Sequence, residues 1–389
     1  MEELLGDRRH TMEQFVSTIA RGLKDERFRL LDIGCAGGID HRWRTFGPRL
    51  QALGIDASAA ECRRLAALEQ NPDISYVAAF VGGSADRPFD ASADAHRRLI
   101  AMFDRLSVRQ MLEIRGARLR GAAIEEKVRH NVWDASDLAD ARTPISAPDL
   151  LAERGWAGLD YLKIDVDGAD FEILRSFEGR FDGLGVLAVE LEVNFVGSGA
   201  ADEHSFHNTD AFMRRHGFEL FRLDSRRYST RALPARFVYP EPAQTVSGRV
   251  FQGDAFYARD PAAGSDKAPS VAQLLKLAAI FSAWELPDCA AEILTVFRDR
   301  LAGPIDVDAM LDRLAVQLQV GAADVLPYRA YMAAFSREAA RFFPPKSTPP
   351  RGPVGPPTFR QRVRAAWAAY RDWVYADEVE AARRKASGR

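Results

Sequence analysis

The sequence predicts an α/β fold with a doubly wound, mostly parallel sheet, followed by an α-helical C-terminal region. Between residues 28 and 260, short apolar runs that end at glycine or acidic residues alternate with helix-like segments. From residue 270 to 343 the apolar spacing is helical throughout, as in VAQLLKLAAIFSAWEL. Hydrophobic residues make up 47% and charged residues 28% of the 389 residues, which is ordinary for a globular protein.

The individual elements follow from local patterns. Buried runs stopped by glycine or acidic residues suit parallel strands. They predict strands at 29–33, 53–55, 74–81, 161–166, 185–192, 218–223 and 249–258. Apolar residues at helical spacing predict helices at 12–24, 59–70, 93–106, 147–154, 171–177 and 210–216. Ser146 is expected to cap the helix that begins before Pro148.

The predicted organisation has five parts. They are an N-terminal helix (1–27), a sheet domain (28–260), a helical region (268–343), a proline-rich linker (344–358) and a basic amphipathic helix (359–389). Residues 344–357 hold seven of the 20 prolines and should be extended. The last helix aligns Val363, Trp367 and Tyr370 on one stripe, so it could contact a membrane surface, a second copy or the body of the protein.

Charge and cysteine content exclude several classes. The net charge is -2, so no global field attracts DNA or RNA and no nucleic-acid partner is expected. Cys35, Cys62 and Cys289 lack CxxC spacing, which argues against a disulfide framework and a cysteine zinc site. The N-terminal stretch does not read as a secretion signal, and no apolar run reaches the ~18 to 20 residues of a membrane span. We therefore expect a cytoplasmic protein.

The strongest local signal is the run LLDIGCAGG at residues 30–38, where a buried strand enters a glycine turn. Gly34, Gly37 and Gly38 allow a sharp turn and close approach of a ligand. Asp56 ends the next strand 22 positions after Gly34, the spacing expected of an acid that binds ribose hydroxyls. Asp32 fits poorly beside a pyrophosphate and well beside a cation such as S-adenosylmethionine. The alternative is a tight turn that binds nothing.

A second acidic strand end follows in DYLKIDVDGADFEILRSF. Ligands of open α/β sheets bind beyond the carboxyl ends of the strands, so Asp165, Asp167 and Asp170 should lie near the glycine turn. Glu190 and Glu192 share one face of the next strand. Such carboxylates predict either a general base or a Mg²⁺ site formed by Asp165 with Glu190 or Glu192.

These blocks resemble the FkbM-type family of class I S-adenosylmethionine-dependent methyltransferases. The similarity lies in LLDIGCAGG with GIDAS, in DYLKIDVDGADFEILRSF and in VLAVELEVNF, and extends over roughly residues 28–258. The resemblance implies a seven-stranded Rossmann-like sheet with an antiparallel edge hairpin, formed here by 218–223 and 249–258. It also implies methyl transfer to oxygen, often of sugars or secondary metabolites. Residues 82–135 match no part of the family pattern and are expected to determine the substrate.

The chemistry then needs a base for the acceptor hydroxyl. The candidates are Asp165 and the histidines His204, His207 and His216, of which the first two lie in a polar loop after the fifth strand. Lys163 interrupts a buried strand and needs a partner or access to water. His41 and Trp43 follow the glycine turn and either cover the cofactor or belong to a helix packed on the sheet.

Three other functions fit parts of the sequence. Asp165 and Asp167 could be the DxD metal clamp of a glycosyltransferase, but this leaves the glycine turn and Asp56 unexplained. A catalytically silent binding or scaffold protein could share the methyltransferase fold. A nicotinamide oxidoreductase is disfavoured because the turn is GxxGG and not GxGxxG. The sequence thus predicts an S-adenosylmethionine-dependent O-methyltransferase for a small-molecule or glycan acceptor.

Overall fold

The structure is a computed structural model of the chain. It describes residues 2–82, 145–166, 169–197, 199–236, 238, 244–264, 269–319, 325–338, 342, 366 and 367. The chain divides into two compact units, Met1–Tyr331 and Met332–Arg389. In the second unit the rings of Phe335 and Phe342 meet edge to face, with their centroids 5.1 Å apart.

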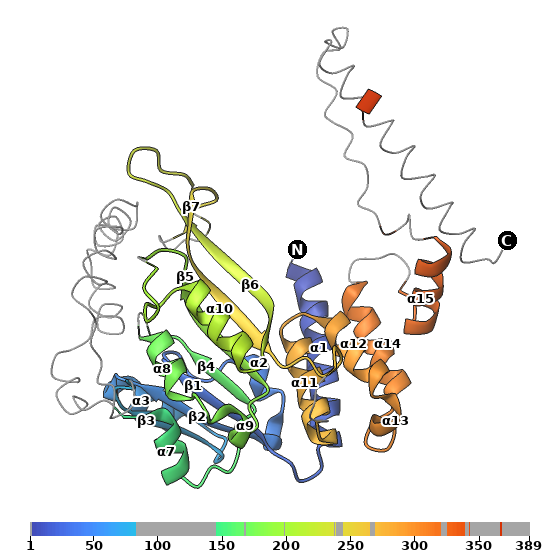
Figure 1. Ribbon diagram of the computed structural model, residues 1–389. Coiled ribbons are helices and arrows are strands. Elements are labelled where there is room, and N and C mark those ends of the chain that lie inside the picture. Colours follow the sequence, from blue (N-terminus) through green and yellow to red (C-terminus); the bar gives the residue numbers. More distant parts are fainter. Residues whose placement is uncertain are drawn as a thin grey trace. The chain divides into compact units, whose positions relative to one another are not determined.

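The first unit is built on a seven-stranded sheet of order β3-β2-β1-β4-β5-β7-β6 (Figure 1). The strands are β1 (Phe28–Ile33), β2 (Leu50–Asp56), β3 (Ile74–Ala78), β4 (Tyr161–Ile164), β5 (Ala188–Asn194), β6 (Glu219–Tyr228) and β7 (Arg249–Ala258). All neighbouring pairs from β3 to β5 are parallel, whereas β7 pairs antiparallel with both β5 and β6. The predicted fold class and the antiparallel edge pair are therefore confirmed.

The helices lie on both sides of this sheet (Figure 1). Those before β5 are α1 (Glu2–Gly22), α2 (His41–Arg44), α3 (Ala59–Leu68), α7 (Ala147–Glu153), α8 (Asp170–Ser176) and α9 (Phe181–Leu184). Those after it are α10 (Phe206–Arg215), α11 (Val271–Ala283), α12 (Pro287–Val296), α13 (Arg298–Leu301) and α14 (Val307–Leu318). A further helix, α15 (Tyr328–Arg337), begins in the first unit and has most of its residues in the second. Ser146 caps α7 by accepting a hydrogen bond from the amide of Asp149, as its sequence predicted.

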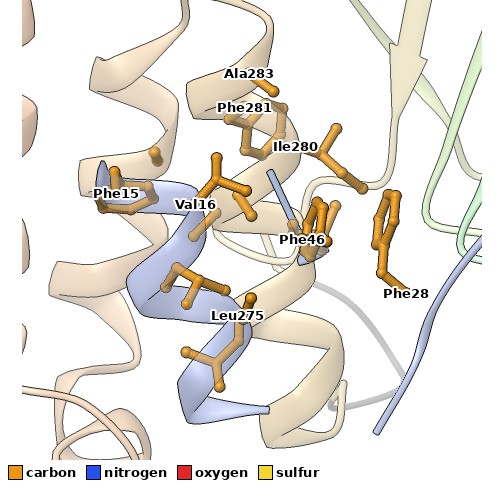
Figure 2. Close-up of a cluster of buried hydrophobic side chains, with 14 of the residues drawn as sticks. Phe15, Val16, Phe28, Phe46, Leu275, Ile280, Phe281 and Ala283 are labelled. Carbon is orange, nitrogen blue, oxygen red and sulfur yellow. The ribbon is translucent and has the colours of Figure 1, made fainter. Parts of the chain in front are cut away.

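One hydrophobic core lies on each face of the sheet. One face, with residues of α7, α8, α9 and α10, encloses Leu31, Leu162, Val189 and Tyr257. The other face is covered by α1, α11 and α14, whose side chains join Phe28 and Phe46 in a single cluster (Figure 2). Ser270 and Gln273 form a reciprocal capping box that starts α11, and its residues Leu274–Ala283 are all buried. The C-terminal helices α11 to α14 thus supply part of the core on this face.

Several boundaries differ from the sequence-based ones for identifiable reasons. The fifth strand begins at Ala188 and not at residue 185, because Gly185 adopts φ 70° and caps α9. Helix α10 begins at Phe206, four residues before the predicted start. The continuous helical region is interrupted, since Pro287 starts α12 and Pro304 lies in the turn before α14.

Some predictions fall outside the described residues. They concern the helix at 93–106, the substrate-determining segment 82–135 beyond residue 82, the linker at 344–358 and nearly all of the last helix at 359–389. Asp167 and Gly168 of the second acidic block also lie outside them. Within the described part of the chain, no helix combines the length and the apolar character that a membrane span requires.

Candidate active site

The glycine turn after β1 packs directly against the end of β4. The amides of Gly34 and Cys35 both donate to the carbonyl of Ile55, at 2.8 and 3.2 Å. Gly34 has φ 86°, and a Cβ added to it would overlap the carbonyl oxygen of Asp165. Only glycine fits both the backbone conformation and this close approach. The sequence-predicted turn and Asp165 are therefore brought together.

Gly37 opens into free space. It has φ 87°, and a Cβ added there would meet no described atom within 4 Å. Its amide donates to the carboxylate of Glu61 at 3.0 Å, a residue that sequence reasoning did not select. The Gly37 amide thus has a partner, but the space beside its Cα is open, and such space at a strand end is what a bound cofactor needs.

Asp56 stands at the end of β2, next to the turn. Its carboxylate accepts a hydrogen bond from the amide of Ser58 at 2.8 Å, and Ser58 in turn caps α3. Burial raises the pKa of Asp56, and the neighbouring charge of Glu61 adds to this, while its hydrogen bonds from backbone amides oppose it. The structure thus fixes the Asp56 carboxylate through a backbone hydrogen bond, at the position where a ribose is expected.

A row of charged residues crosses the centre of the sheet on the face that α1 and α11 cover. Asp32 of β1 is in register with Lys163 of β4, and Lys163 is in register with Glu190 of β5. Gly54 of β2 continues the row without a side chain. The sequence had already marked Lys163 as a lysine in a buried strand that needs a partner.

Lys163 holds the row together. Its Nζ lies 3.2 Å from Asp32 Oδ1 and 3.5 Å from Asp165 Oδ2, so the expected partner of this lysine exists. Burial lowers the pKa of Lys163, but the charges of Asp32, Asp165 and Glu190 outweigh this and the pKa is raised. Lys163 therefore stays protonated. Burial raises the pKa of Asp32, and Lys163 opposes that rise.

Asp32 consequently does not present a free charge to a ligand. Its side chain is 5% exposed and is paired with Lys163, whereas that of Asp165 is 45% exposed. Of the two predicted acids, Asp165 is the one that a ligand at the strand ends can reach.

Glu190 is connected through hydrogen bonds to Trp284 at the end of α11. Tyr161 donates its hydroxyl proton to Glu190 Oε2 at 2.7 Å and accepts from Trp284 Nε1 at 2.9 Å. Burial raises the pKa of Glu190, against the opposing effects of the Arg42 guanidinium and the Tyr161 hydrogen bond. Trp43 packs on Tyr161 and is 2% exposed, so it belongs to the core and does not cover a cofactor.

The carboxylates predicted to bind Mg²⁺ have other partners. Glu192 accepts from Arg226 at 2.7 Å and from Gln252 at 2.9 Å, while Glu190 accepts from Tyr161. Within the described ranges, no group of three or more His, Cys, Asp or Glu side chains could hold a metal ion. The predicted Mg²⁺ site is therefore not supported, because cations and hydroxyl donors already occupy these oxygens.

His204 links two secondary-structure elements. Its Nε2 lies 2.9 Å from the carbonyl of Glu192, and its Nδ1 lies 3.7 Å from Asp170 Oδ2. Its side chain is 9% exposed. The Oδ1 atom of Asn194 beside it is buried and has no hydrogen-bond partner among the described residues. His204 thus joins the end of β5 to the start of α8.

The other two histidines lie apart from the glycine turn. His207 is exposed in the first turn of α10, where its Nδ1 contacts the hydroxyl of Ser205 at 3.1 Å. His216 packs between the rings of Phe181 and Phe212 at the far end of α10. Neither contact brings an imidazole to the Lys163–Asp165 pair.

The residues present fit a nucleoside-type cofactor carrying a positive charge. The turn at Gly37 leaves open space, Asp56 offers acceptors for hydroxyl groups, and Asp165 offers an exposed carboxylate at the neighbouring strand end. The Lys163 ammonium lies 3.2 Å from an oxygen of Asp32 and 3.5 Å from an oxygen of Asp165, whose side chain remains 45% exposed.

Comparison with known proteins agrees with this arrangement. Residues 140–220 match the family model described as "Methyltransferase FkbM domain". This range holds β4, α8 and β5, and with them the second and third blocks of the predicted resemblance, which is confirmed there. The glycine turn lies outside it. No curated protein sequence matches the chain significantly.

Solved structures with similarity to the chain include several methyltransferases. A fibrillarin/Nop5p complex shares 12% identity at a TM-score of 0.27, covering 62% of this chain and 79% of that one. The plantazolicin methyltransferase BpumL in complex with SAH shares 9% identity at a TM-score of 0.23, covering 66% and 90%. The 23S rRNA methyltransferase ErmE shares 10% identity at a TM-score of 0.26, covering 84% and 88%. The fold class here rests on the strand order and not on these distant likenesses.

Proposed function

We infer that the protein is a methyltransferase that uses S-adenosylmethionine, an inference that the family match and the sheet order support. We propose that it transfers the methyl group to a hydroxyl oxygen of a sugar, glycan or secondary metabolite. One observation carries the proposal: the open glycine turn packs against the carbonyl of Asp165, so the cofactor surface and an exposed carboxylate share one edge of the sheet. S-adenosylmethionine would supply an electrophilic methyl group when bound.

The chain's own residues would then bind and orient the cofactor, and one of them would accept the proton of the acceptor hydroxyl. The Asp56 carboxylate would accept hydrogen bonds from ribose hydroxyls, with its position set by the Ser58 amide. The open space beside Gly37 would admit the cofactor without a side-chain clash. These groups would orient the cofactor with its sulfonium toward the end of β4, where Asp165 is exposed.

Asp165 would act as the general base for the acceptor hydroxyl. Its carboxylate is held 3.5 Å from the Lys163 ammonium, which restricts its rotation. Proton acceptance by a positioned carboxylate contributes roughly 10²–10⁴-fold to rate. His204 is a weaker candidate, because its imidazole already links Glu192 and Asp170.

The test separates cofactor binding from chemistry. Calorimetry with S-adenosylmethionine should show binding by the full chain and at least a tenfold loss of affinity in Asp56→Ala. With labelled S-adenosylmethionine and a panel of sugars, polyols, phenols and macrolides, the parent should methylate at least one hydroxyl. Asp165→Asn should bind S-adenosylmethionine within a few-fold of the parent and lose transfer by roughly 10²-fold or more.

Asp149→Asn is the matched control. This carboxylate lies on α7 and is 59% exposed, with an ion pair of 3.6 Å to Arg180. It should change neither measurement. Equal affinity for S-adenosylmethionine in Asp56→Ala and the parent would overturn the cofactor site. Tight binding without transfer to any acceptor class would favour a catalytically silent binding protein.

A further inference from the structure

A cavity of about 390 Å³ lies where the sheet meets the C-terminal helices. Residues from α1, α2, β6, the α11–α12 turn and α14 line it together, and the polar ones include Arg42, Arg222, Asp224, Trp284, Glu285 and Gln317. The FkbM-like match covers none of these residues. The cavity therefore lies outside the part of the chain that matches the family model.

The registers of the strands place the cavity relative to the proposed site. Lys163 is in register with Glu190, Glu190 with Phe256 of β7, and Phe256 with Arg222 of β6. Trp284 stacks on Phe256 at 4.4 Å, which puts the cavity on the same face of the sheet as Lys163. Three strand spacings separate Arg222 from Lys163, or about 14 Å.

Each of the two arginines that line the cavity forms an ion pair with an aspartate. Arg42 Nη2 pairs with Asp40 at 2.9 Å, and Arg222 Nε pairs with Asp224 at 2.8 Å. Both guanidinium groups also lie over the Trp284 ring, at 4.9 and 5.9 Å from its centroid. An ionic ligand would have to displace one of these partners. An uncharged group with several hydroxyls could instead share the donors and acceptors that the pairs present.

Glu285 supplies an independent observation. It adopts φ 58° in the turn after α11, a conformation that glycine takes without strain and that other residues adopt at a cost. Its carboxylate lines the cavity, with Oε2 3.9 Å from Arg222 Nη1. Lys24, the other described non-glycine residue with positive φ, has φ 54° and is exposed after α1, away from the residues that line this cavity. Strain at Glu285 therefore coincides with a polar cavity, while at Lys24 it does not.

We propose that this cavity is a second subsite, which binds an uncharged, hydroxyl-bearing part of the methyl acceptor about 14 Å from the Lys163–Asp165 pair. The inference rests on the proposed function and extends it: the acceptor is long enough to reach both places. The helices α11 and α14 then belong to the substrate site as well as to the core. Arg222 and Glu285 are the residues that contact the remote group.

The experiment uses the full chain and a printed array of neutral and acidic oligosaccharides. The strongest neutral oligosaccharide is then titrated by calorimetry into the parent, Arg222→Gln, Glu285→Gly and Lys24→Gly. Arg222→Gln should weaken binding at least tenfold and Glu285→Gly about fivefold. Lys24→Gly should bind as the parent does. Both glycine variants should unfold at a higher temperature than the parent, since each relieves a left-handed residue.

The outcomes are distinguishable. Absence of binding to every neutral oligosaccharide on the array, a preference for acidic ones, or unchanged affinity in both Arg222→Gln and Glu285→Gly would overturn the subsite. S-adenosylmethionine is titrated into the same samples. If S-adenosylmethionine binds but the oligosaccharide titrations give one of these contrary results, only the subsite proposal is overturned. If an oligosaccharide binds at this cavity but S-adenosylmethionine does not bind to the protein, the proposed methyltransferase function is overturned.

Discussion

The two faces of the central sheet differ in chemistry although the same strands form them. In β4, Leu162 points into the core with α8 and α10 and is fully buried, while Lys163 on the opposite face is 22% exposed and paired with Asp32. In β5, Val189 lies on the first face and Glu190 on the second. One residue step therefore moves a side chain from a core of packed hydrocarbons to a row of charges.

The difference shows under which conditions buried charges are tolerated in a sheet. Each group of the charged row has a partner: Asp32 has Lys163, Glu190 has Tyr161, and Glu192 has Arg226. The row also runs toward the carboxyl ends of the strands, where Asp165 is exposed. Buried charges are tolerated because they are paired, and one of their neighbours reaches the site. The following predictions test this contrast between the two faces.

The largest effect is expected from Lys163→Met. The change removes the ammonium from Asp32, which is 3% exposed, and leaves a buried carboxylate without its ion-pair partner. The free energy of unfolding at pH 7 should fall by about 3–5 kcal/mol. Urea unfolding followed by circular dichroism measures it.

The double variant Asp32→Asn/Lys163→Met is the control for that result. It removes both charges, so it should be more stable than Lys163→Met alone. A double variant no more stable than the single one would show that Lys163 acts through packing of its methylenes and not through the ion pair.

Leu162→Ala tests the apolar face one residue away. Leu162 is fully buried, so its truncation leaves a cavity and should lower the free energy of unfolding by about 3 kcal/mol. Below its unfolding temperature, this variant should keep the parent's affinity for S-adenosylmethionine. Calorimetry on the folded variant checks this, and a tenfold loss of affinity would mean that the two faces are not separate in function.

The sequence predicted the glycine turn, Asp56 and Asp165 because each belongs to a short local motif that follows a strand. It predicted the seven-stranded sheet with its antiparallel edge pair only through the resemblance, since strand pairing joins residues far apart, such as Leu30 and Tyr161. The Tyr161–Trp284 hydrogen bond spans 123 positions, and no local pattern indicates it. The Mg²⁺ prediction is not supported for a similar reason: Arg226, which donates a hydrogen bond to Glu192, lies 34 positions away on another strand.

A matched pair of tyrosines sharpens the contrast further. Tyr161 and Tyr257 are both fully buried, on opposite faces. Tyr161→Phe removes the hydroxyl that serves both Glu190 and the Trp284 indole, and should cost about 2 kcal/mol. Tyr257→Phe loses only a 3.4 Å contact with Asp210 and should cost about 0.5 kcal/mol. Equal costs, measured by urea unfolding, would remove the distinction between the faces.

The smallest effect concerns the pH dependence of Glu190→Gln. Burial raises the folded-state pKa of Glu190 above its unfolded value of about 4.3, so this carboxyl contributes its stability below that pH and loses it as the pH rises. Glutamine cannot ionise, and its carbonyl can still accept the proton of Tyr161. The stability of Glu190→Gln relative to the parent should therefore increase between pH 4 and pH 8, as measured by urea midpoints at both values. A relative stability that stays constant or decreases would mean that Arg42 and Lys163 hold Glu190 ionised without penalty, and that the charged row is as well adapted to its charges as the other face is to its hydrocarbons.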